Sequence, residues 1–232
     1  MERVPHRAAA SLGLIAVAGV CWAITVQRMH GMDMGPGTDL GDLGWFAVVW
    51  VTMMAAMMLP SLVPMAVASP GALRFAAGYL ATWLGAGVIA YAIVRGVRAL
   101  DPSWLAWDRG GPYVAGGVIL IAALYELTPV KAACLRHCRD TGLLVRREPL
   151  LMGLEHGVFC VGSSWALMAA LFAVGVMNVT WMIVIAALVA VEKLLPSQRT
   201  AIGATALIVA VLGLAVAFAP GHVPALTIPG MG

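Results

Sequence analysis

Apolar residues fill seven long stretches of the chain, and shorter segments with polar residues, glycine or proline separate them. An α-helix needs about 20 apolar residues to cross the hydrocarbon core of a bilayer. We therefore predict an all-α fold, a polytopic transmembrane helical bundle that forms one integral membrane domain over residues 1–232. The predicted spans cover residues 8–26, 45–63, 75–94, 113–130, 150–176, 179–193 and 201–219.

Basic residues are distributed unequally between the segments that join these spans. Seven spans place the termini on opposite sides, and an N-terminus on the inside leaves ten of the 14 Lys and Arg residues in cytoplasmic segments. The four that then lie outside are Arg28, Arg95, Arg98 and Arg109. Because Lys and Arg are enriched in cytoplasmic loops, we predict that the N-terminus is inside and the C-terminus outside.

The composition supports a membrane protein and argues against several classes of partner. Hydrophobic residues make up 62% of the chain and charged residues only 11%, whereas a soluble domain is typically about half apolar and about one quarter charged. The net charge is only +3, and the sequence has no glycine-rich phosphate-binding loop. We expect the lipid bilayer as a partner, and neither nucleic acid nor a nucleotide.

Four methionines share one face of the second span. At about 100° per residue, Met53, Met54, Met57 and Met58 fall on one side of a helix, and Trp50 projects into the middle of this Met stripe. Methionine often fills irregular gaps in a core, so packing is one interpretation. Thioether sulfur is also a soft ligand for Cu(I), which is the other.

Two prolines follow the stripe. Proline lacks the backbone N–H that an internal helical position must donate, and its ring clashes with the preceding turn. We therefore predict that the helix kinks or breaks at Pro60 and Pro64, close to the methionines.

The segment after the fourth span combines two cysteines with a histidine. If it is helical, Cys134 and Cys138 stand one turn apart on the same face, and His137 lies beside Cys134. The predicted topology places the segment in the cytoplasm, where thiols stay reduced, so it favours metal or redox chemistry over a disulfide. The alternative is a basic segment that binds anionic lipid headgroups, with cysteines as small apolar residues or palmitoylation sites.

Polar and sulfur-containing residues also recur along the fifth span. Met152, His156, Cys160 and Ser164 lie four residues apart and form a strip on one helical face. A histidine within a span is costly and indicates function, with a hydrogen bond between helices as the alternative.

These candidates are predicted to lie at a common depth. At about 1.5 Å per residue, the cytoplasmic half of the bilayer contains four of them: Met57, Met58, His156 and Cys160. Glu126 and Glu192, near the inner ends of the fourth and sixth spans, add carboxylates at similar depth. The alternative for these carboxylates is ion pairing, of Glu126 with Lys131 and of Glu192 with Lys193.

On the opposite side, the loop between the first two spans carries His30, Met32 and Met34 close to Asp33. Imidazole, thioether and carboxylate groups in this arrangement are similar to a capture site for copper, although a short loop of this kind also arises by chance.

Four blocks of the sequence form a joint pattern over most of residues 45–195. The blocks are Met-Met-x-x-Met-Met-Leu-Pro from Met53, Cys-Leu-x-x-Cys-Arg from Cys134, His-Gly-x-x-Cys from His156, and Met-Asn-x-x-Trp-Met from Met177 followed by Glu192-Lys193. The pattern resembles an uncharacterised family of bacterial integral membrane proteins that are predicted to bind metal. The resemblance implies a helical metal-binding protein of the bacterial inner membrane. Members of that family often have cysteines where this chain has Ser163 and Ser164, so two thiols of the pattern are missing here.

Together these patterns predict a protein that handles Cu(I) by transport, delivery or insertion. The Met stripe would supply thioethers, His156 and Cys160 stronger ligands within the bilayer, and Cys134, His137 and Cys138 a cytoplasmic docking or exit point. The outer loop would collect the ion. Zinc is the second choice, since three cysteines and a histidine form a sound zinc shell, but it leaves the methionines unexplained.

Two other functional classes remain open. The chain would be an accessory subunit if its Met and Trp residues pack against a membrane enzyme, such as a copper-dependent membrane monooxygenase. It would be an enzyme if the metal served redox or quinone chemistry. With only five histidines in the chain, it lacks the histidine sets of haem or di-iron sites, and we expect no enzymatic activity.

Overall fold

Each of the seven predicted apolar stretches forms an α-helix, and an eighth helix lies between the fourth and the fifth. The computed structural model describes residues 3–29, 40–100, 107–140, 148–175 and 178–226. Within these ranges the helices are α1 (Arg3–Met29), α2 (Leu43–Ala68), α3 (Ala72–Ala99), α4 (Gly111–Glu126), α5 (Pro129–Arg139), α6 (Pro149–Val174), α7 (Val179–Leu194) and α8 (Gln198–Phe218), and a 3-10 turn follows at Pro220–His222. The predicted all-α class is confirmed.

Local chemistry explains where several helices begin. The side chain of Asp42 accepts a hydrogen bond from the backbone N–H of Trp45 at 2.9 Å, and that of Asn178 accepts one from Trp181 at 3.2 Å. Such N-caps satisfy backbone donors that have no partner within the helix. Proline occupies the first turn of α4, α5 and α6, where its missing N–H costs nothing.

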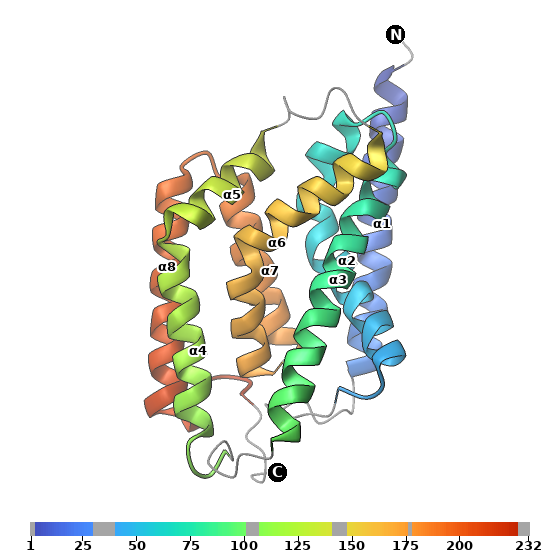
Figure 1. Cartoon of the computed structure of the whole chain (residues 1–232). Helices are drawn as coiled ribbons and strands as arrows, with labels where there is room; N and C mark the ends of the chain where they lie inside the picture. The colour runs from blue at the N-terminus through green and yellow to red at the C-terminus, as the bar shows by residue number, and fades with distance from the viewer. Residues whose placement is uncertain (1–2, 30–39, 101–106, 141–147, 176–177, 227–232) are drawn as a thin grey trace.

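Figure 1 shows a bundle in which α6 and α7 lie between two groups of helices. The first group is α1, α2 and α3, and the second is α4 with α8. The start of α1 and the end of α8 lie at opposite ends of the bundle, and α5 crosses the end at which α2 finishes and α3 begins (Figure 1). We call this end the α5 end.

Five helices are long and apolar enough to cross a membrane: α1 from Ala8 onward, α2, α3, α6 and α8. Helices α4 and α5 pass the same test only as a pair, bent by 65° at Leu127 and Thr128. Helix α7 has 16 residues, so at about 1.5 Å per residue it extends about 24 Å, less than the roughly 30 Å of a hydrocarbon core. By length and composition, the described residues therefore contain five or six candidate spans.

Helix α2 does not break at its prolines. It continues as one helix through Pro60 and Pro64 to Ala68, so of the predicted kink or break, the break does not occur. The carbonyls that lose their usual N–H partner are those of Ala56 and Pro60, four residues before each proline. Neighbouring helices, side chains and local adjustments make such losses tolerable inside membrane helices. Helix α6 likewise runs unbroken through Gly162.

Two glycines allow α3 and α6 to cross in close contact. A Cβ atom on Gly78 would lie 2.2 Å from the Leu150 carbonyl oxygen, and one on Gly153 would lie 2.0 Å from that of Phe75. Only hydrogen fits at these two positions. The crossing fixes α3 against the first half of α6, which carries His156 and Cys160.

We predict that Gly78→Ala lowers the free energy of unfolding by about 2 kcal/mol or more, because backbone atoms must separate to admit the methyl group. The matched control is Gly85→Ala in the same helix, where nothing lies within 4 Å of the added Cβ. The control should be neutral or stabilising by up to about 1 kcal/mol, because alanine favours helix. Thermal unfolding in detergent measures both, and equal effects would contradict the close crossing.

Candidate functional site

The α5 end of the bundle is organised around a buried lysine. Lys131 in the first turn of α5 is fully buried, and its ammonium group donates to carboxylate oxygens of Glu126 on α4 and, at 2.7 Å, of Glu192 on α7. The second oxygen of each carboxylate has no hydrogen-bond partner among the described residues. Charges removed from water are costly unless paired, so this triad holds three helices in one arrangement.

Other contacts keep α5 folded back over the bundle. The side chain of Thr128 caps α5 by accepting from the backbone N–H of Lys131. Gln198, at the start of α8, donates to the Ala132 carbonyl at 3.1 Å, and Arg139 donates to the Glu192 carbonyl at 3.4 Å. The bend after Glu126 is thus stabilised along most of the length of α5.

The bend brings together two cysteines that are distant in the sequence. Cys138, in the last turn of α5, is buried and lies near enough to Cys160 and Ser163 of α6 for those side chains to influence its thiol. Cys160 is completely buried. The two thiols therefore lie near each other between α5 and α6, and we call them the cysteine pair. The sequence analysis assigned Cys138, with Cys134, to a cytoplasmic docking or exit point. It did not predict that Cys138 lies near Cys160.

Two polar groups from other helices contact the Cys160 sulfur. The Tyr79 hydroxyl of α3 and the Lys193 ammonium group of α7 each lie 3.0 Å from Sγ. The ion pair of Glu192 with Lys193, which was the alternative interpretation of Glu192, is not found, because Glu192 binds Lys131 and Lys193 points to Cys160. Consecutive helical residues project about 100° apart, so the two side chains face different neighbours.

Lys193 also links the cysteine pair to the Met stripe. Its ammonium group lies 3.4 Å from the Ser61 hydroxyl of α2. Ser61 follows Met57 by one turn, on the same helical face. At the other end of the stripe, Trp50 packs against Phe172 of α6, with ring centroids 5.5 Å apart. Met54 and Met57, which share this helical face, therefore lie between these two contacts.

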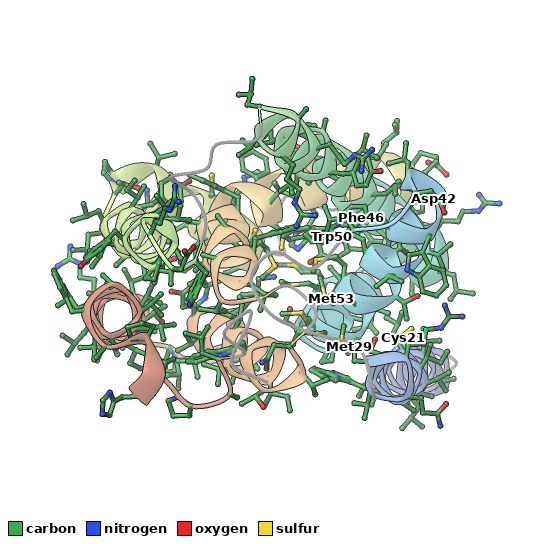
Figure 2. The ribbon with its side chains drawn as sticks, turned by 90° about the horizontal axis from the view of Figure 1, so that it is seen from below. Cys21, Met29, Asp42, Phe46, Trp50 and Met53 are labelled. Atoms are coloured by element: carbon green, nitrogen blue, oxygen red, sulfur yellow. The ribbon has the colours of Figure 1, made fainter. Side chains whose placement is uncertain are left out.

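The methionines of the stripe lie inside the protein. Met53, Met54, Met57 and Met58 are all buried, with at most 4% of the residue surface exposed. Figure 2 shows Phe46, Trp50 and Met53 of α2 pointing into the bundle, where sulfur atoms gather between α2 and the helices opposite. Met168 of α6 and Met182 of α7 are buried in the same core. The four methionines of the stripe are therefore part of the core of this chain and are not exposed for contact with a partner enzyme.

The remaining candidates on α5 and α6 surround the pair without joining it. His156 is buried one turn from Cys160, and its ring lies 5.6 Å from Phe75 and 5.9 Å from Tyr79. His137 stacks on Phe159 with ring centroids 3.6 Å apart. Cys134 packs at Gly162, where its Sγ lies 2.9 Å from the position of an added Cβ.

The predicted outer capture site, His30, Met32 and Met34, lies outside the described residues.

Ser163 and Ser164 are buried beside the pair, and Ser163 donates to the Cys160 carbonyl at 2.9 Å. In the described ranges no group of three or more His, Cys, Asp or Glu side chains has a geometry suited to a metal ion. The Cys3His shell considered for zinc is thus not assembled there.

Sequence reasoning missed Tyr79 and Lys193. Tyr79 lies in an apolar stretch with no pattern around it, and Lys193 resembled an ordinary basic residue at the end of a span. The one available signal was the position of Lys193, because an ionisable group at the end of an apolar helix often faces the bundle interior.

We predict that Lys131→Met lowers the free energy of unfolding by about 3–5 kcal/mol, because two buried carboxylates lose their counter-charge. Labelling of Cys138 by a maleimide, mapped by mass spectrometry, should become faster because α5 is released. The matched control is Arg136→Met, an exposed position on the same helix. Equal protection of Cys138 in both variants would show that the triad does not hold α5.

Comparison with known proteins assigns the chain to a family. No curated protein and no solved structure matches it. One family model matches residues 47–216, which extend from α2 into α8 and include both cysteines of the pair. The chain belongs to the PpoB2 copper chaperone family.

Proposed function

We propose that this protein binds Cu(I) as cargo between the thiols of Cys138 and Cys160 and passes it to an acceptor. The observation that carries the proposal is that these two thiols, from α5 and α6, lie near each other in a buried core that also contains the methionines of the stripe. Thiolate and thioether are the soft ligands that select Cu(I). Copper handling by the family supports the choice of metal.

The number and type of ligands favour Cu(I) over Zn(II). A structural zinc site is closed by four Cys, His or carboxylate ligands. The part of the chain that the structure describes offers two adjacent thiols and several thioethers, with no group of three conventional zinc ligands. Few and labile ligands also suit a carrier, because a transferred ion must be able to leave.

The Met stripe would give the ion a path to the pair. Met54 and Met57 lie on the face of α2 between the contacts of Trp50 with α6 and of Ser61 with Lys193. An ion that moves along the stripe would exchange one thioether for the next and end at the stronger thiolates. We assign His156, one turn from Cys160, to this same path as a reserve ligand.

We predict that Cys138→Ser and Cys160→Ser each abolish stoichiometric Cu(I) binding by purified protein in competition with a chelator of known affinity. Met57→Leu combined with Met58→Leu should weaken binding by about tenfold, equivalent to about 1.4 kcal/mol, because leucine keeps the volume and removes the sulfur. The matched controls are Cys21→Ser and Cys134→Ser, which remove thiols outside the pair. Unchanged binding in both pair variants would refute the site.

We propose seven crossings, with the N-terminus inside and the C-terminus outside, in a bacterial inner membrane. The helix bounds support the orientation, since the α5 end carries the larger share of basic residues. The cysteine pair would then lie near the cytoplasmic face.

We also propose that the acceptor of the ion is a membrane protein partner. We propose a carrier rather than an enzyme, because transfer of an ion requires no covalent chemistry on a substrate.

The orientation predicts which positions an impermeant maleimide reaches in intact cells. In a background without native cysteines, Arg109→Cys should be labelled from outside. Arg199→Cys, at the α5 end, should be labelled only after the membrane is permeabilised. Both positions are exposed in the structure, so burial does not interfere. The reverse pattern of labelling would overturn the orientation.

A further inference from the structure

The environment of Lys193 points to a role in the choice of metal. This residue lies in the last turn of α7, and its ammonium group lies 3.0 Å from the Cys160 sulfur of the neighbouring helix α6. The neighbouring carboxylate, Glu192, is held by Lys131. The positive charge of Lys193 is therefore directed at the thiol pair.

The net charge of a metal–thiolate complex depends on the metal, and Lys193 lies beside one of the two thiols. Each thiol loses its proton to the solvent when it binds the metal, so Cu(I) between two thiolates forms a complex with one net negative charge. Cys160 is fully buried, and an anion in such surroundings is unstable without a counter-charge. The Tyr79 hydroxyl, also at 3.0 Å, can donate a hydrogen bond to the sulfur but contributes no charge.

We propose that Lys193 is the counter-charge of the Cu(I) bis-thiolate complex and makes the Cys138–Cys160 pair selective for monovalent soft cations over divalent ones. The inference rests on the proposed function of this pair. A divalent ion between the same two thiolates gives a neutral complex, which gains nothing from a nearby ammonium group. Lys193 thus favours Cu(I) and Ag(I) by electrostatics, in addition to the softness of the ligands.

A comparison of Cu(I) with Hg(II) tests this inference, because both ions bind two thiolates in a linear arrangement and differ by one unit of charge. The full-length protein is titrated with each metal in competition with a small thiol. Lys193→Met keeps the length of the side chain and removes its charge. We expect Cu(I) affinity to fall by about tenfold or more and Hg(II) affinity to stay equal or rise, because the ammonium group attracts only the anionic complex.

Two further variants complete the design. Lys193→Arg retains the charge and should keep the wild-type preference for Cu(I) over Hg(II). Arg74→Met removes an exposed cation at the α5 end, beside Glu148, and should change neither affinity. Because Hg(II) binding itself reports an intact pair, a variant that fails to fold is recognised by the loss of both metals together with its thermal unfolding.

The outcomes separate the two hypotheses. If Lys193→Met folds and changes both affinities equally, or changes neither, Lys193 does not set the charge preference, while the cysteine pair remains the copper site. If the wild-type protein binds neither metal at the pair, or Cys138→Ser leaves both affinities unchanged, the proposed function itself is wrong. A selective loss of Cu(I) affinity in Lys193→Met supports both.

Discussion

The structure of the α5 end depends on one buried positive charge. Lys131 is removed from water and must keep its contacts with Glu126 and Glu192, because a buried ammonium group without them would be strongly destabilising. These contacts connect α4, α5 and α7. The constraint explains why α5, a short helix with several basic residues, lies across the bundle instead of extending away from α4 (Figure 1).

The position of α5 in turn brings Cys138 close to Cys160. Cys138 reaches Cys160 only because α5 turns back after Glu126, and Cys160 is fixed by the close crossing of α3 and α6. Tyr79 and Lys193 then contact the same sulfur from two further helices. Under the proposed function, two thiols in such polar contacts would hold a soft cation.

Packing and metal binding are compatible roles for the Met stripe. Helix α2 lies between α1 and α3 in the first group of helices, and its methionines fill space in the buried core. A flexible thioether adapts to an irregular gap and remains a weak ligand. Under the proposed function, the same property that makes methionine a good core residue would let a bound ion move from one sulfur to the next without large changes in the fold.

The sequence by itself determined the helices and most of the residue types at the site. Long apolar runs gave the seven predicted helices, because a helix satisfies its own backbone in an apolar environment. Periodicity placed the Met stripe on one face, and the ion pair of Glu126 with Lys131 was among the alternatives considered. Tertiary structure decided which side chains are in contact, including those of Glu192 with Lys131 and of Lys193 with Cys160. It also decided that α2 continues past two prolines. Periodicity orders side chains within one helix only, whereas the pairing of Cys138 with Cys160 depends on a 65° bend and on burial energies shared among several helices.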